Sequence, residues 1–173
     1  MPTQNKLDAT YIKMASFWAD LSKAKRKKVG CLIVKDGAII SDGYNGTPSG
    51  FNNDCEYEDP KSFDGDLITK PEVLHAESNA ITKLAKSTQS SDGATMYITI
   101  SPCVDCAKLI IQSGIKRVVY GEVYRNEDGI NLLNKANIET KKYNNKSIEV
   151  NLKSNGLEKS INESINVIIR KSK

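Results

Sequence analysis

Histidine, cysteine and long apolar stretches are scarce in this sequence. A single histidine, His75, occurs among 173 residues, and four cysteines are too few for the disulfide framework of a small secreted protein. No apolar run approaches the roughly 20 residues that a membrane-spanning helix needs. The first residues, Met1 to Lys6, lack the apolar core of a secretory signal. The sequence therefore predicts a cytoplasmic protein without a membrane segment.

Length and composition are typical of one compact folded unit. Hydrophobic residues make up 39% of the chain and charged residues 27%, which is ordinary for a soluble protein with a core. We expect a single domain over residues 1–143. The segment 144–173 begins rich in Asn, Lys and Ser, and apolar residues then recur at helical spacing between Leu157 and Ile168. This pattern predicts a C-terminal extension with a docking helix.

The one histidine belongs to a pattern that predicts a metal site. Glu77 lies two residues after His75, and Cys103 and Cys106 follow in a Pro-Cys-x-x-Cys motif. One imidazole and two thiolates suit zinc and leave a fourth tetrahedral position open for water. The Glu77 carboxylate can then act as a base that is not itself a ligand. The combination is similar to the signature of zinc-dependent nucleobase deaminases.

Two non-catalytic interpretations of these motifs stay open. A lone histidine is often a satisfied core or surface residue, and a single Cys-x-x-Cys can be a redox pair. The pair can also be half of a closed structural zinc site, with Cys55 from a polar loop as the fourth ligand. Cys31 lies in an apolar run and is expected to be buried.

The net charge of +4 comes from one short segment. Five of the six residues from Lys23 to Lys28 are basic, and the remainder of the chain is close to neutral. Such a run is often only a solvated face. Its position directly before an apolar strand also suits contact with the phosphate of a nucleotide. No aromatic residue is interleaved with the run, so nucleic acid is not an expected partner.

Hydrophobic periodicity predicts helices that alternate with strands. The expected helices span 8–23, 75–86, 102–111 and 131–135, with Asp8 as an N-cap and Pro102 in a first turn. The expected strands span 29–34, 38–41, 95–100, 117–120 and 138–140, the first two joined by an Asp36-Gly37 hairpin turn. Strands separated by helices imply parallel neighbours in a covered sheet. His75, Cys103 and Cys106 would then lie where the positive ends of two helix dipoles meet.

The segment from Thr47 to Glu72 is long for a loop inside a compact domain. Loops of this length are often functional. We expect it to be a lid or a subunit contact.

Four blocks of sequence resemble the deoxycytidylate (dCMP) deaminases of the cytidine deaminase superfamily. The blocks are, in chain order, KVGCLIV from Lys28, GYNGTP from Gly43, HAESNAI from His75 and CAKLIIQSGI from Cys106. The resemblance extends from about Tyr11 to Tyr143, and the GYNGTP block favours the nucleotide branch. It implies an α/β fold, a three-layer α-β-α sandwich around a mixed five-stranded sheet. It also implies hydrolytic deamination of dCMP, supplying dUMP for thymidylate synthesis.

The resemblance implies roles for individual residues as well. His75, Cys103 and Cys106 would hold Zn2+, which lowers the pKa of its water toward about 7, while Glu77 moves protons between water and base. The residues expected to contact the substrate are Ser22, Lys23, Lys28, Asn45, Ala76, Ser101 and Tyr124. Within this set, the backbones at positions 76 and 101 would bind the cytosine and the side chain at 45 the sugar hydroxyl. The residues at 22, 23, 28 and 124 would lie near the phosphate.

Regulated members of the family bind dCTP as an activator or dTTP as an inhibitor at subunit contacts. The resemblance therefore implies a homo-oligomer, a hexamer in the family, and a candidate effector site. The candidate effector residues are Gly43, Tyr44, Asn45, Gly46, Lys83 and Lys86. Some regulated relatives have an aromatic residue at the position of Lys83, which weakens the expectation of regulation.

Two other functions remain as alternatives. The substrate could be another cytosine or amino-base compound, such as dCTP, deoxycytidine, guanine or a tRNA base. The chain could also be a non-catalytic binding module that zinc stabilises.

Overall fold

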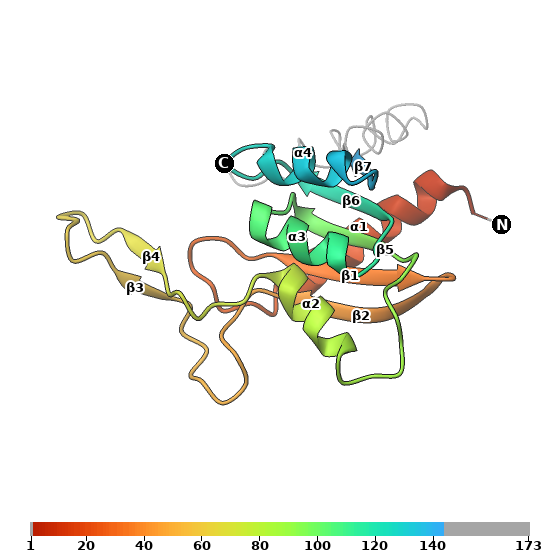
Figure 1. The fold of residues 1–173 in the computed structure, drawn as a ribbon. Helices are drawn as coiled ribbons and strands as arrows, with labels where there is room; N and C mark the ends of the chain where they lie inside the picture. Colours follow the sequence, from red (N-terminus) through yellow and green to blue (C-terminus); the bar gives the residue numbers. More distant parts are fainter. Residues whose placement is uncertain (1, 144–173) are drawn as a thin grey trace, which may run out of the picture. The chain divides into compact units, whose positions relative to one another are not determined.

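The computed structural model describes residues 2–143, which form a five-stranded sheet with helices on both faces (Figure 1). The strands lie in the order β2-β1-β5-β6-β7. They are β1 (Gly30–Lys35), β2 (Ala38–Tyr44), β5 (Thr95–Ile100), β6 (Arg117–Glu122) and β7 (Glu139–Lys142). The helices are α1 (Gln4–Ala19), α2 (Ala76–Leu84), α3 (Val104–Gln112) and α4 (Asp128–Lys135). The predicted extension 144–173 and its docking helix lie outside the described residues.

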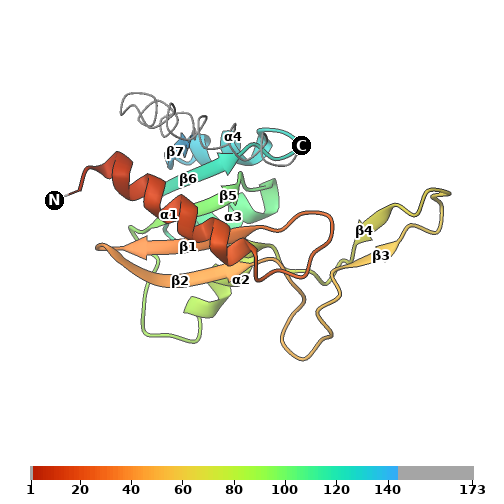
Figure 2. The ribbon, with the colours of Figure 1, turned by 180° about the vertical axis from the view of Figure 1, so that it is seen from behind.

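The sheet is mixed and covered on both faces, as predicted. Strand β1 pairs antiparallel with both β2 and β5, while β6 pairs parallel with β5 and β7. Helix α1 lies on one face of the sheet, and α2, α3 and α4 lie on the other (Figures 1 and 2). The α/β class and the three-layer arrangement around a mixed five-stranded sheet are therefore confirmed.

The hairpin turn predicted at Asp36-Gly37 joins β1 to β2. Both residues have positive φ, 51° and 78°, in the left-handed region that Asp tolerates and Gly favours. The pairing continues as far as Gly30 opposite Tyr44, so β2 ends three residues later than position 41. This extension brings the end of β2 close to the start of α2.

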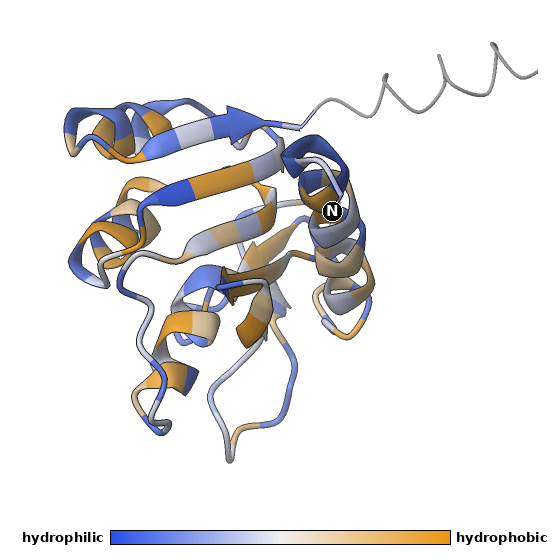
Figure 3. Cartoon of the chain, turned by 90° about the vertical axis from the view of Figure 1, so that its right-hand side faces the viewer, coloured by the Kyte–Doolittle hydropathy of each residue, from blue (hydrophilic) through white to orange (hydrophobic). Residues whose placement is uncertain are grey.

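Alternating side chains of the central strands divide the core into two halves. Cys31 and Ile33 belong to the larger cluster, under α2, α3 and α4, whereas Leu32 and Val34 pack on the α1 side. All four are buried, as expected for Cys31. This period of two is the normal pleat of a strand with both faces covered. Figure 3 shows the apolar strands between the helical layers.

Helix α1 differs from its prediction at both ends. It begins at Gln4, because the Thr3 side chain accepts a hydrogen bond from the Lys6 N–H and forms the N-cap. It ends at Ala19, not near Lys23. Asp8, predicted as the cap, is fully buried inside the helix.

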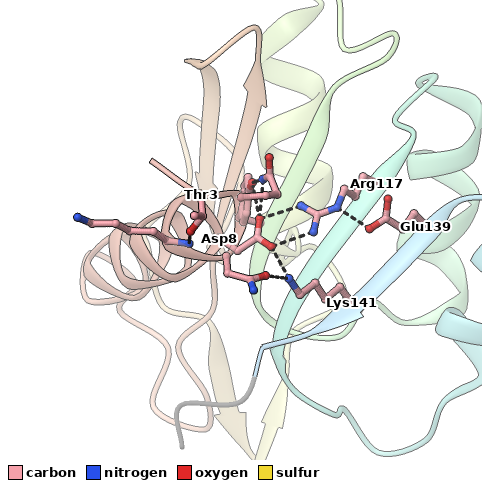
Figure 4. Close-up of polar contacts among 9 residues, drawn as sticks. Thr3, Asp8, Arg117, Glu139 and Lys141 are labelled. Atoms are coloured by element: carbon pink, nitrogen blue, oxygen red, sulfur yellow. Dashed lines mark hydrogen bonds and ion pairs between the residues drawn. The ribbon is translucent and has the colours of Figure 1, made fainter. Parts of the chain in front are cut away.

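Asp8 is the centre of a network that connects α1 to β6 and β7 (Figure 4). Arg117 donates to both carboxylate oxygens at 2.8 Å, and Lys141 donates to Oδ2 at 2.8 Å. Gln4 and Tyr97 donate to Oδ1. Burial alone would raise the pKa of Asp8, but these hydrogen bonds outweigh it and hold the pKa well below its usual value. The carboxylate is thus charged and fully paired.

The segment from Thr47 to Glu72 is not a plain loop. It contains strands β3 (Glu56–Glu58) and β4 (Leu67–Thr69), which pair as an antiparallel hairpin. Figures 1 and 2 show this hairpin extending beyond the edge of the main sheet. Sequence analysis missed both strands because each has only three residues.

Within the described residues, no helix is long and apolar enough to cross a membrane.

We predict that Asp8→Asn lowers the free energy of unfolding by about 2 to 3 kcal/mol at neutral pH, because it leaves the partly buried Arg117 and Lys141 without their counter-charge. The depressed pKa means that Asp8 stabilises the fold above its ordinary pKa of 3.8 and loses this effect as the pH falls. The difference between wild type and variant should therefore shrink below about pH 4. Denaturant unfolding from pH 7 to pH 2 measures both effects.

The matched control is Asp36→Asn, the same change in an exposed turn that Asn-Gly suits equally well. It should leave stability and its pH dependence unchanged. Equal losses in the two variants would contradict the role of the buried network.

Candidate active site

The three predicted metal ligands lie at the N-terminal ends of two helices. His75 is the N-cap of α2, Cys103 is the N-cap of α3, and Cys106 lies in the first turn of α3. His75 and Cys103 both have extended backbones, so each helix begins one residue later than its ligand. Pro102 was predicted to lie in the first turn of this helix. It instead precedes the N-cap of α3. Because β2 and β5 are both antiparallel to β1, they end at the same edge of the sheet.

The ligand atoms have the spacing that a zinc ion requires. His75 Nδ1 lies 3.6 Å from Cys103 Sγ and 3.4 Å from Cys106 Sγ. All three ligand atoms lie within 4.8 Å of one another. With Zn–S bonds of about 2.3 Å and Zn–N bonds of about 2.0 Å, neighbouring atoms of a tetrahedral site lie about 3.5 to 3.8 Å apart. The two distances from His75 therefore fit a tetrahedral zinc site.

Hydrogen bonds among the ligands shift their pKa values in opposite directions. A hydrogen bond from Cys106, with a further contribution from His75, lowers the pKa of Cys103 to about 4. The same contact with Cys103, together with burial, raises the pKa of Cys106. Hydrogen bonding to Cys103 also raises the pKa of His75. A divalent cation can replace the shared protons of such a cluster.

Glu77 lies beside this cluster and is buried, with 3% of its surface exposed. Burial raises the pKa of Glu77 to about 7, so the carboxyl group can both accept and donate a proton near neutral pH. It is not part of the three-residue cluster itself. This placement is the one predicted for a base that is not a ligand.

Two glycines allow the helices to approach the site. A Cβ on Gly43, in β2, would lie 2.2 Å from the carbonyl oxygen of Ala76. A Cβ on Gly129, in α4, would lie 2.0 Å from the carbonyl oxygen of Pro102. Any side chain at either position would push the start of α2, or the loop before α3, away from the metal ligands.

A cavity of about 230 Å³ opens over the cluster. One part of its lining is His75, Glu77 and Cys103, at the metal cluster. Another part is polar and holds the basic residues Arg26, Lys27 and Arg125 beside Glu56, Thr69 and Tyr124, and we call it the basic end. The lining therefore offers both a metal cluster and cationic groups to a ligand.

Cys55 does not complete the metal site. It is buried in the segment before β3, where its Sγ lies 3.9 Å from the carbonyl oxygen of Asn53. Among residues 2–143, the candidate metal cluster comprises only the histidine and the two cysteines of α3. The closed structural zinc site with Cys55 as fourth ligand is therefore wrong for this part of the chain.

Four of the predicted substrate contacts line the cavity. They are Asn45, Ala76, Ser101 and Tyr124. The N–H of Ala76 is one of the first in α2, and such groups have no partner within their own helix. The Asn45 side chain accepts from the Val29 N–H at 2.8 Å and donates to the Lys27 carbonyl at 2.9 Å. Asn45 thus holds the basic segment against the cavity.

The other three predicted contacts, Ser22, Lys23 and Lys28, are not among the residues that line the cavity. The Ser22 hydroxyl is buried and donates to the Asn45 carbonyl, and Lys28 Nζ lies 3.4 Å from the Asp20 carbonyl. Sequence analysis missed three basic residues that do line the cavity. They are Arg26, Lys27 and Arg125. The first two belong to the predicted basic run, but its sequence does not reveal which members face inward.

The candidate effector residues have structural contacts in the single chain. Gly43 allows close packing of α2, and Gly46 forms a β-bridge with Leu74 just before the His75 ligand. The Tyr44 carbonyl accepts from Asn79. Lys83 pairs with Asp42 at 2.6 Å, and Lys86 is exposed just after α2. Effector binding at these residues stays a prediction.

The chain is similar in sequence to known zinc-dependent deaminases. The family model of the cytidine and deoxycytidylate deaminase zinc-binding region matches residues 5–122. The deoxycytidylate deaminase of Enterobacteria phage T4 is 36% identical over 159 residues, covering 70% of this chain and 81% of the phage protein. The human deoxycytidylate deaminase is 37% identical over 121 residues, covering 68% of this chain and 66% of the human protein.

A solved structure shares the fold over its whole length. The crystal structure of dCMP deaminase from the cyanophage S-TIM5 in complex with dCMP and dUMP matches with a TM-score of 0.73. It is 43% identical in sequence, and the match covers 82% of this chain and 100% of that chain.

We predict that Cys106→Ser reduces the zinc content of the purified protein from one ion per chain to less than about a tenth of that, because a hydroxyl replaces a thiolate ligand. Cys55→Ser is the matched control and should keep one ion per chain. Metal analysis of the two dialysed proteins measures the effect. Loss of zinc from the Cys55 variant would contradict the three-ligand site.

Proposed function

The chain belongs to the cytidine and deoxycytidylate deaminase family, and we propose that it hydrolyses dCMP to dUMP and ammonia. It is a zinc-dependent deaminase, since the family model spans its zinc-binding region and the three ligands fit the ion. The observation that carries the choice of substrate is the cavity, whose lining combines residues of the metal cluster and Glu77 with basic side chains. The solved cyanophage relative in complex with dCMP and dUMP supports the same choice.

Glu77 moves the protons of the reaction. His75, Cys103 and Cys106 would hold the zinc ion, which would lower the pKa of a bound water toward about 7. Glu77 takes a proton from this water and gives it to ring nitrogen 3 of cytosine, while the oxygen bonds to carbon 4. It then carries the proton of the new hydroxyl to the amine nitrogen, which leaves as ammonia. One buried carboxyl group beside the metal ligands suits both directions of transfer.

The backbone at the two helix starts orients the base. The Ala76 N–H points out of the first turn of α2 and donates to the carbonyl oxygen of cytosine in our proposal. The Ser101 carbonyl accepts from the amine that leaves. Ser101 is itself held by a hydrogen bond from its N–H to the Glu122 carbonyl and by one from the Tyr124 N–H to its hydroxyl. Asn45 contacts the sugar hydroxyl.

We place the phosphate at the basic end of the cavity. Arg26 donates to the Thr69 hydroxyl at 2.9 Å, and Arg125 lies over the Tyr124 ring at 5.4 Å. Within residues 2–143, neither arginine forms an ion pair with a carboxylate, whereas Lys27 pairs with Glu122 at 2.8 Å. The two guanidinium groups are therefore the best available partners for a phosphate.

Supply of dUMP for thymidylate synthesis, regulation by dCTP and dTTP, assembly as a homo-oligomer and a cytoplasmic location accompany this proposal as predictions. Deaminases of dCTP, deoxycytidine, guanine or a tRNA base are the alternatives within the enzyme class. Ammonia release compared across these compounds and dCMP separates them. Faster turnover of any other compound would replace dCMP as the substrate.

We predict that Glu77→Gln lowers kcat for dCMP by a factor of roughly 1,000 or more, because the amide cannot shuttle protons. The variant should keep its zinc and its unfolding midpoint. Ammonia release, metal analysis and thermal unfolding measure the three quantities. A binding module that only needs zinc for stability would be indifferent to this change.

We also predict that Arg26→Ala and Arg125→Ala each raise KM for dCMP about tenfold, the effect of losing one charge-assisted contact. KM for deoxycytidine, which has no phosphate, should not change. Lys23→Ala and Lys28→Ala remove charge from the same region outside the cavity and are the controls. A larger effect in the lysine variants than in the arginine variants would reverse our placement of the phosphate.

A further inference from the structure

The side chain of Glu56, the first residue of β3, binds backbone N–H groups at the basic end of the cavity. Its carboxylate accepts from the Lys25 N–H at 3.1 Å through both oxygens. It also accepts from the Arg26 N–H at 3.2 Å. Two successive backbone N–H groups around one anion form a nest, a common binding site for phosphate. Glu56 therefore occupies a site with the chemistry of a phosphate pocket.

This nest borders the cavity over the metal cluster, although Lys25 itself is not among the lining residues. Glu56 and Arg26 both line the cavity, together with Lys27 and Arg125. The Arg26 guanidinium is tied to Thr69 of β4 and does not pair with the Glu56 carboxylate. The carboxylate thus lies among cationic groups but is held by the main chain. A phosphate entering this end of the cavity would meet the same N–H groups.

We propose, on the basis of the function proposed above, that the Glu56 carboxylate occupies the binding position of the substrate phosphate when no substrate is bound. Glu56 is then a specificity-determining residue. A nucleotide phosphate takes over the Lys25 and Arg26 N–H groups, and the Glu56 side chain swings out toward solvent. Carboxylate and phosphate cannot share the nest, because two anions at hydrogen-bond distance from the same donors repel each other.

The exchange favours a particular kind of ligand. A dianionic phosphate has more charge and more acceptor oxygens than a carboxylate, so it can displace Glu56. A nucleoside without phosphate cannot, and it meets a cavity whose far end is already filled. Only a ligand with a phosphate therefore gains the nest, and competition with Glu56 sets how tightly the monophosphate binds.

A purely structural role for Glu56 makes the opposite prediction. If the carboxylate only supports the backbone of the basic segment, its loss disorders that segment and weakens nucleotide binding. Glu56→Gln separates the two roles. The amide oxygen of Gln still accepts from both N–H groups, while the negative charge that competes with phosphate is gone.

The test compares Glu56→Gln with wild type and with Glu58→Gln, the same change at an exposed position of β3 outside the cavity. We expect Glu56→Gln to lower KM for dCMP about tenfold, the equivalent of one charge-assisted hydrogen bond. kcat for dCMP and KM for deoxycytidine should stay within about twofold of wild type, and Glu58→Gln should match wild type. A raised KM for dCMP in Glu56→Gln would overturn the proposal.

A second measurement does not depend on turnover. Calorimetric titration of the zinc-loaded proteins with inorganic phosphate gives the Kd for phosphate. We expect this Kd to be about tenfold lower in Glu56→Gln than in wild type or Glu58→Gln. Equal or weaker phosphate binding would overturn the proposal. If phosphate binds more tightly but dCMP is not deaminated by any of the three proteins, the proposed function fails while the role of Glu56 stands.

Discussion

One imidazole and two thiolates can meet around one ion here only because two helices begin at the same point. This close approach depends on the packing of α2 against β2, where Gly43 leaves room for the Ala76 carbonyl, and on the packing of α4 against the loop before α3, where Gly129 does the same. The electrostatics of the site follow from this geometry. Helix N-termini favour thiolates, and the buried carboxyl group of Glu77 keeps a raised pKa because the same packing excludes water.

The Asp8 network and the metal site lie at opposite ends of the parallel strands β5 and β6. Arg117, the first residue of β6, binds Asp8 of α1, whereas Ser101 and the ligand Cys103 follow the last residue of β5. The carboxyl ends of parallel strands are the usual place for ligands in such sheets. The charges at the start of the strands are fully paired and hold layers together. The polar groups at the far end keep free bonding capacity, which a substrate can use.

Sequence alone predicted what is local and missed what is distant. His75, Glu77, Cys103 and Cys106 could be identified because short motifs specify both their chemistry and their spacing. Asp8 was taken for a helix cap because its partners lie 109 and 133 positions away, at Arg117 and Lys141. No periodicity in the N-terminal segment reports such contacts. The hairpin β3-β4 was missed because two strands of three residues give no measurable alternation.

The orientation of the basic run, residues 23–28, could not be predicted from the sequence either. Its sequence predicted contact with a phosphate but not which side chains make it. Asn45 binds the Lys27 carbonyl, and Glu56 binds the Lys25 and Arg26 N–H groups, so residues 18 and about 30 positions away decide how the segment faces the cavity. Each of these contacts uses backbone groups. Any sequence of similar length could be held in the same way, so the identity of the basic residues carries no trace of their orientation. The charge of the cavity lining, in which Glu56 and Glu77 occur with three cationic side chains, is therefore a property of tertiary structure and not of the run itself.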